Sequence, residues 1–249
     1  MTTPLPLLNA IHPTTGHNSV QSTRRAALAW VGSLAVNTTL ALTGLQAGAA
    51  DAPAALPATT AADDVRYAAA MAQFNRALAG DEAAIAPAAA QFRALMAADP
   101  AQPVYRAQAG SATCLLASTT ILPWKKMAFA EDGLALLDKA LAQLTPAHDA
   151  QRVGGVPASL MVRFSAASTF GALPGMFNRG ERGAKLLDEV LKSPLLAEAP
   201  LPFRASVWLR AADSAASAQR ADEARQWLQR VASSGAPQAG QAQARLKAL

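Results

Sequence analysis

The sequence is poor in the residue types that most often carry chemistry. Its 249 residues include one cysteine, three histidines and only 5% aromatic residues. With Cys114 as the single cysteine, no disulfide can form within the chain. His12 and His17 lie near the N-terminus, so His148 is the one histidine of the longer remainder. A zinc site built from several His or Cys ligands is therefore excluded.

The motifs of common enzyme classes are also missing. There is no Gly-x-Ser-x-Gly turn to hold a nucleophilic serine, and no glycine-rich loop of the phosphate-binding or dinucleotide-binding type. We expect Cys114 to be a buried residue within a helix, and His148 to be a solvated residue in a turn. The sequence predicts no enzymatic activity and no cofactor, and it leaves a carboxylate-based, metal-free enzyme as a third possibility.

The residues that are abundant favour helices. Hydrophobic residues make up 51% of the chain, while β-branched runs are rare outside the N-terminal segment. Ala and Leu must therefore form most of the core, and both have high helix propensity. Removing the two arginines of residues 1–49 from the 22 basic residues leaves 20 against 17 acidic residues, a balance of +3. This mild and dispersed charge predicts no nucleic-acid partner.

Residues 1–49 have the organisation of a signal peptide. Arg24 and Arg25 are the only charged residues in this segment, and a weakly apolar stretch, 26–45, follows them. Small residues at 47–50 are of the kind that signal peptidase accepts. The proline- and alanine-rich residues 50–62 predict a flexible linker. We therefore expect a periplasmic or secreted protein with no stable membrane insertion once the signal is removed.

The arginine pair, with Thr23 before it and Leu28 after it, resembles a twin-arginine signal. Ala27 departs from that pattern, because a large apolar residue usually stands there. An ordinary secretory signal and a retained membrane anchor are the alternatives. No cysteine follows the apolar stretch, so a lipid anchor at that point is excluded.

Apolar residues recur at helical spacing along the rest of the chain, and Pro and Gly separate the segments. This pattern predicts an all-α fold of about eight helices and a short C-terminal tail. The predicted helices span residues 63–79, 84–98, 103–119, 126–144, 158–170, 179–191, 203–218 and 221–233. We expect a break at residues 121–123 and a loop at residues 151–157.

The helices form pairs that are closed by prolines. Ala88, Phe92 and Pro100 stand four and eight residues apart, and Gly110 follows where close helix contact requires a small residue. Trp208, Ala212, Ala224 and Leu228 repeat the arrangement near the C-terminus. This pattern resembles tetratricopeptide repeats, although the middle pairs need insertions near residues 121–126 and 151–157. The resemblance implies that residues 63–249 form antiparallel helix pairs stacked as a superhelix, with a concave face that binds proteins or peptides.

Candidate partner contacts come from three places. Arg106, Arg163 and Arg210 lie on the first helices of the proposed pairs, which line the concave face in this family, where they would clamp an acidic peptide or a carboxylate. The other candidates are Trp124 and Lys125 in the expected insertion, and Phe170, Phe177 and Arg179 around a Leu-Pro-Gly turn. For each of these residues, a purely structural role is the alternative.

The sequence thus predicts an exported scaffold or accessory module that binds a protein or peptide without catalysis. The alternative is a periplasmic protein that binds a small molecule in a pocket near residues 170–179. An enclosed pocket of several hundred cubic ångströms would favour the alternative, and an open groove would favour the interaction module.

Overall fold

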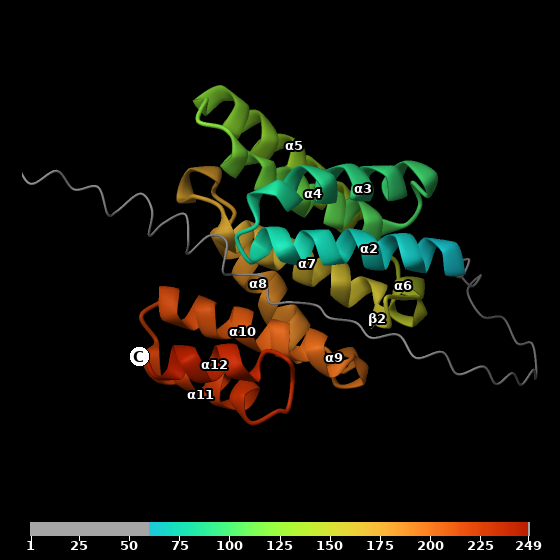
Figure 1. Ribbon diagram of the computed structural model, residues 1–249. Coiled ribbons are helices and arrows are strands. Elements are labelled where there is room, and N and C mark those ends of the chain that lie inside the picture. The colour runs from blue at the N-terminus through green and yellow to red at the C-terminus, as the bar shows by residue number, and fades with distance from the viewer. Residues whose placement is uncertain (1–59, 249) are drawn as a thin grey trace, which may run out of the picture.

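The computed structural model describes residues 60–248 of the chain (Figure 1). The predicted signal, including Arg24 and Arg25, lies outside the described residues. The first helix begins at Ala61, two residues before the predicted start at residue 63. The longer helices are α2 (Ala61–Leu78), α3 (Ile85–Ala98), α4 (Pro103–Leu116), α5 (Pro123–Ala142), α7 (Ala158–Ala172), α8 (Gly180–Lys192), α10 (Leu201–Ser217), α11 (Ala221–Ala232) and α12 (Ala239–Leu246).

Short elements fill the connections. They are the helices α6 (Ala147–Ala150) and α9 (Leu195–Glu198), the 3-10 turns η1 (Glu82–Ala84), η2 (Ala117–Thr119) and η3 (Gly175–Phe177), and the strands β1 (Arg152–Val153) and β2 (Val156–Pro157). The strands pair as an antiparallel hairpin where we predicted a loop. Gly154 and Gly155 both have positive φ, as a two-residue hairpin turn of this kind requires. Val153 and Val156 are fully buried, so the hairpin packs as part of the core.

Local sequence explains where the main helices begin. The Thr60 side chain accepts a hydrogen bond from the backbone N–H of Asp63, which caps α2. The Gln102 side chain caps α4 in the same way, ahead of a proline in the first turn. The predicted break is confirmed at residues 121 and 122, but α5 begins at Pro123, a first-turn proline, three residues before the predicted start. Trp124 and Lys125 are therefore helical residues and not part of a loop.

The helices pack as successive antiparallel pairs, which confirms the predicted all-α class. The pairs are α2–α3, α4–α5, α7–α8 and α10–α11, and α12 packs on the last of them. Tyr67 at the start of α2 has its ring centroid 6.1 Å from that of Phe92 on α3 and 5.9 Å from that of Tyr105 at the start of α4. The starts of α2 and α4 therefore lie together, and the first helices of these pairs run in the same direction.

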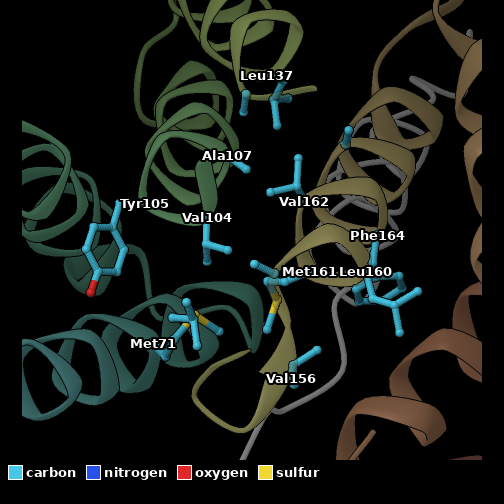
Figure 2. Close-up of a cluster of buried hydrophobic side chains, with 14 of the residues drawn as sticks. Met71, Val104, Tyr105, Ala107, Leu137, Val156, Leu160, Met161, Val162 and Phe164 are labelled. Atoms are coloured by element: carbon cyan, nitrogen blue, oxygen red, sulfur yellow. The ribbon is translucent and has the colours of Figure 1, made fainter. Parts of the chain in front are cut away.

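The main core lies between the first three pairs. Figure 2 shows side chains of α2, α4, α5 and α7 converging on one another, among them Met71, Val104, Leu137 and Met161. Helix α4 is central, since every residue from Pro103 to Cys114 is buried. A smaller apolar cluster ties α10 to α11 and α12.

Two glycines set the distance between α4 and α5. A Cβ atom added at Gly110 would lie 2.8 Å from the carbonyl oxygen of Gly133, and one added at Gly133 would lie 2.6 Å from the carbonyl oxygen of Gly110. Neither separation is possible between ordinary side chains and backbone. The prediction that Gly110 permits close helix contact is therefore confirmed.

Within residues 60–248, no helix is both long enough and apolar enough to cross a bilayer.

Candidate partner-binding surfaces

A small pocket opens where the first helices α2, α4 and α7 meet. Met71 and Phe74 of α2 and Met161 and Phe164 of α7 supply its apolar lining. Its polar lining comes from α4 and α7 and consists of Gln108, Ser111, Ser165, Ser168 and Thr169. We call these nine residues the inner pocket. None of the nine lining side chains is charged. A group that enters the pocket must therefore be neutral, because burying a charge without a partner costs free energy.

Two hydrogen-bonded pairs cross from α4 to α7 in the inner pocket. Gln108 Nε2 donates to Ser165 Oγ at 3.2 Å, and Ser111 Oγ lies 2.8 Å from Thr169 Oγ1. Each of these groups can form more bonds than the one that joins the pair, because an amide has two donors and a hydroxyl has two acceptor sites. The pairs hold the two helices together, and Ser165 Oγ also donates to the carbonyl oxygen of Met161 at 2.8 Å.

Ser168 is one of several residues with a buried polar side-chain atom that has no hydrogen-bond partner among the described residues. Its side chain is 3% exposed, and its hydroxyl has no hydrogen-bond partner among residues 60–248. Buried hydroxyl groups are nearly always hydrogen-bonded, since an unsatisfied one costs about 1 to 3 kcal/mol. The hydroxyl oxygen has almost no accessible surface, so a partner group could reach it only if neighbouring side chains moved.

The size of the inner pocket limits what it can hold. Its volume is about 20 Å³. Pockets that enclose small molecules measure roughly 300 to 1,000 Å³, whereas a single water needs about 10 to 15 Å³. The inner pocket therefore has room for a water or the tip of one side chain.

A second surface lies at the end of the molecule where α5 begins. Ile121 and Trp124 are 81% and 66% exposed, and Lys125 and Lys126 beside them are also exposed. We call residues 121–126 the exposed tip. Trp124 does not cover the core, because its position in the first turn of α5 turns its ring to solvent.

The connection after α7 lies at the same end. Gln108 bonds to Ser165 and Ser111 to Thr169, so α4 and α7 run in parallel and in register. The residues that follow them, 117–122 and 173–179, therefore emerge at one end of the molecule. Met176 is 72% exposed there.

The predicted residues of the Leu-Pro-Gly turn are mostly engaged within the protein. Phe170 is fully buried, and Phe177 packs partly buried against the core. Arg179 Nη2 lies 2.9 Å from Asp138 Oδ2, and Arg182 Nη1 lies 2.6 Å from Asp138 Oδ1. Both guanidinium carbons stand 5.4 Å from the centroid of the Phe170 ring. This cluster fastens α8 to α5 and α7.

The three arginines expected on a concave face do not converge. Arg106 is buried, and its guanidinium donates to Gln143 Oε1 at 2.7 Å and to the carbonyl oxygen of Pro100 at 2.9 Å. Arg163 Nε lies 3.8 Å from Glu189 Oε2. The three side chains point toward different neighbours, so they do not form one clamp.

Arg210 packs within the protein against α7. A Cβ atom at Gly171 would overlap its guanidinium, so the glycine makes room for the side chain. Burial lowers the pKa of Arg210 to about 10, while Asp213 acts in the opposite direction. Asp213 in turn forms an ion pair with Arg245 of α12.

The remaining nucleophile and base candidates are enclosed. Cys114 is buried as expected, and burial raises the pKa of its thiol to about 12. His148 was expected to be solvated, and this was wrong. It is 4% exposed, and its Nδ1 accepts a hydrogen bond from the backbone N–H of Thr145 at 3.0 Å. No group of three or more His, Cys, Asp or Glu side chains suited to a metal occurs in the described part of the chain.

Comparison with other proteins adds no relative. No protein-family model, no characterised protein and no solved structure matches this chain.

Sequence reasoning missed the polar lining of the inner pocket. Gln108 and Ser111 stand three residues apart on α4, and Ser165 and Thr169 stand four apart on α7. Such spacing puts each pair on one face of its helix. The helical spacing of these polar residues on α4 and α7 is the sequence feature that could have predicted the pocket.

Proposed function

We propose that this chain is a non-catalytic interaction module that binds a segment of a protein partner across the inner pocket. The observation that carries the proposal is the small, mainly apolar pocket that α2, α4 and α7 share, with Met71, Phe74 and Met161 among its lining residues. A peptide can place the tip of one apolar side chain in such a pocket while its backbone stays outside.

The arrangement of helices supports this reading. Antiparallel pairs with their first helices in a row are the expected form of a tetratricopeptide-repeat module, and the inner pocket lies on that row. We therefore propose a fold of that type. The predicted twin-arginine-like signal supports export to the periplasm or beyond, where the partner would be an envelope protein.

The pocket volume favours a peptide over a small molecule. At about 20 Å³, the inner pocket takes one side-chain tip while the rest of a peptide lies outside it. A metabolite held in an enclosed site needs more than ten times that volume. The second candidate, a small-molecule binder, has no comparable observation in its favour.

Site-specific photo-crosslinking tests the proposal. A photoreactive phenylalanine analogue at Thr169, at the partly exposed edge of the pocket, should capture one envelope protein in cells that produce the chain. The matched control carries the analogue at Ala216, an exposed residue of α10, and should capture nothing specific. Capture should also disappear when Ser168→Leu fills the pocket in the Thr169 chain. Equal capture from both positions, or capture that Ser168→Leu leaves unchanged, would contradict the proposal.

A further inference from the structure

The exposed tip is a second surface, separate from the inner pocket. Figure 1 shows the start of α5 projecting beyond the neighbouring ends of α3 and α4. Ile121 and Trp124 stand on this projection with most of their surface in water. Exposed large apolar side chains that stand together mark a contact surface.

The charge of the exposed tip identifies the chemistry of the contact. Lys125 and Lys126 follow Trp124 directly, and the residues from Ala117 to Ala130 include no acidic side chain. The first carboxylates of α5 are Glu131 and Asp132, about two turns farther along. A partner that meets the tip therefore meets apolar and positively charged groups only.

This combination suits the surface of a bilayer. Tryptophan prefers the boundary between lipid headgroups and acyl chains, and apolar side chains beside it enter the acyl boundary. Lysines next to them attract anionic headgroups, and one lysine strengthens binding about fivefold. A protein partner would need a hollow that receives a projecting hairpin end, whereas a bilayer accepts a convex tip without one.

We infer that the exposed tip docks this protein on an anionic lipid surface, with Ile121 and Trp124 at the headgroup boundary and Lys125 and Lys126 on the anionic headgroups. Docking of this kind is peripheral, since no described helix is apolar enough to span a membrane. Met176 lies at the same end of the molecule and adds apolar surface there. The inner pocket lies along the side of α4 and α7, so the tip can rest on lipid while the pocket faces a partner.

Tryptophan quenching by brominated lipids tests this inference on the full chain. The signal of Trp124 is taken as the difference between the wild-type chain and Trp124→Phe, so the other tryptophans and the N-terminal segment cancel. Vesicles that contain brominated phosphatidylglycerol and phosphatidylcholine should quench this difference signal. Vesicles of brominated phosphatidylcholine alone should quench it much less.

Charge variants test whether lipid binding depends on the lysines of the exposed tip or on lysines elsewhere on the surface. Lys125→Gln with Lys126→Gln should weaken the quenching response to anionic vesicles roughly 25-fold in lipid concentration, about fivefold for each lysine. The matched control is Lys139→Gln, an exposed lysine farther along α5, which should leave the response unchanged. Val65→Ser is the apolar control, because Val65 is 71% exposed at the opposite end of the molecule.

Each outcome decides the inference. Quenching that requires phosphatidylglycerol and depends on Lys125 and Lys126 supports it. A Trp124 signal that neither vesicle changes overturns it, and leaves the tip to a protein partner. An equal response to both vesicles, or an equal loss in Lys139→Gln, also overturns it. The photo-crosslinking result at the inner pocket is independent of all these outcomes.

Discussion

Replacing Gly133 by alanine is the most direct test of how the central helices pack. The added Cβ atom would lie 2.4 Å from Cys114 Sγ, 2.6 Å from the carbonyl oxygen of Gly110 and 2.8 Å from the backbone nitrogen of Cys114. Two of these three contacts are to the backbone of α4, so no side-chain rotation relieves them. Helices α4 and α5 must move apart to accept the methyl group.

Two opposing effects set the magnitude. Alanine within a helix is more favourable than glycine by about 0.5 to 1 kcal/mol. Forcing an extra methyl group into a packed core typically costs about 1 to 3 kcal/mol, and backbone contacts below 3 Å place this site toward the upper end. We therefore expect Gly133→Ala to lower the free energy of unfolding by about 1 to 2 kcal/mol.

Urea unfolding followed by circular dichroism measures this loss. With a slope of about 2 kcal/mol per molar urea, the midpoint should fall by roughly 0.5 to 1 M. Gly240→Ala on α12 is the matched control, because a Cβ atom there meets nothing within 4 Å. That variant should be as stable as the wild type or more stable. Adding Cys114→Ala to Gly133→Ala should restore part of the loss only, since the contact with Gly110 remains. A Gly133→Ala chain as stable as the wild type would refute the packing described above.

Three further predictions concern single side chains. Cys114 should resist thiol reagents at mildly alkaline pH until the chain unfolds, because burial raises its pKa to about 12; reaction in the native state would contradict its placement. Burial raises the pKa of Asp213 above its usual value, so the folded state holds that proton more tightly than the unfolded state. Stability of the wild type relative to Asp213→Asn should thus rise as pH falls through the folded pKa, and urea midpoints at several pH values should show this slope. Gln219 has a φ of 59°, so Gln219→Gly should stabilise the chain by about 1 kcal/mol in thermal or urea unfolding, and a loss would contradict the assigned conformation.

The helical periodicity of the sequence was enough to predict most of the fold. Each of the eight predicted helices corresponds to an observed one, because Ala- and Leu-rich stretches between Pro and Gly leave little choice of structure. The start of the fourth helix was predicted at residue 126, whereas α5 begins at Pro123. A proline ends a helix when it follows one and begins a helix when it occupies the first turn, and the sequence around residues 121–123 permits both.

The direction of polar side chains was much harder to predict. Arg106 lies on α4, which is buried on every side, so helical periodicity gives no outward face for that helix. Its guanidinium bonds to Gln143 on the far side of α5, 37 residues along the chain, and to the carbonyl oxygen of Pro100 just before α4. His148 is buried for a similar reason, because the short helix α6 packs against the hairpin and α7. These contacts depend on tertiary packing and have no local signal.

The most direct test of the interaction module is peptide binding at the inner pocket. The partner segment that crosslinks to position 169 would be synthesised, and its affinity for the full chain measured by calorimetry. We predict saturable binding at a one-to-one ratio that Ser168→Leu abolishes and that Lys125→Gln with Lys126→Gln leaves unchanged. Equal affinity for the wild-type and Ser168→Leu chains, with both chains folded, would contradict the role of the pocket.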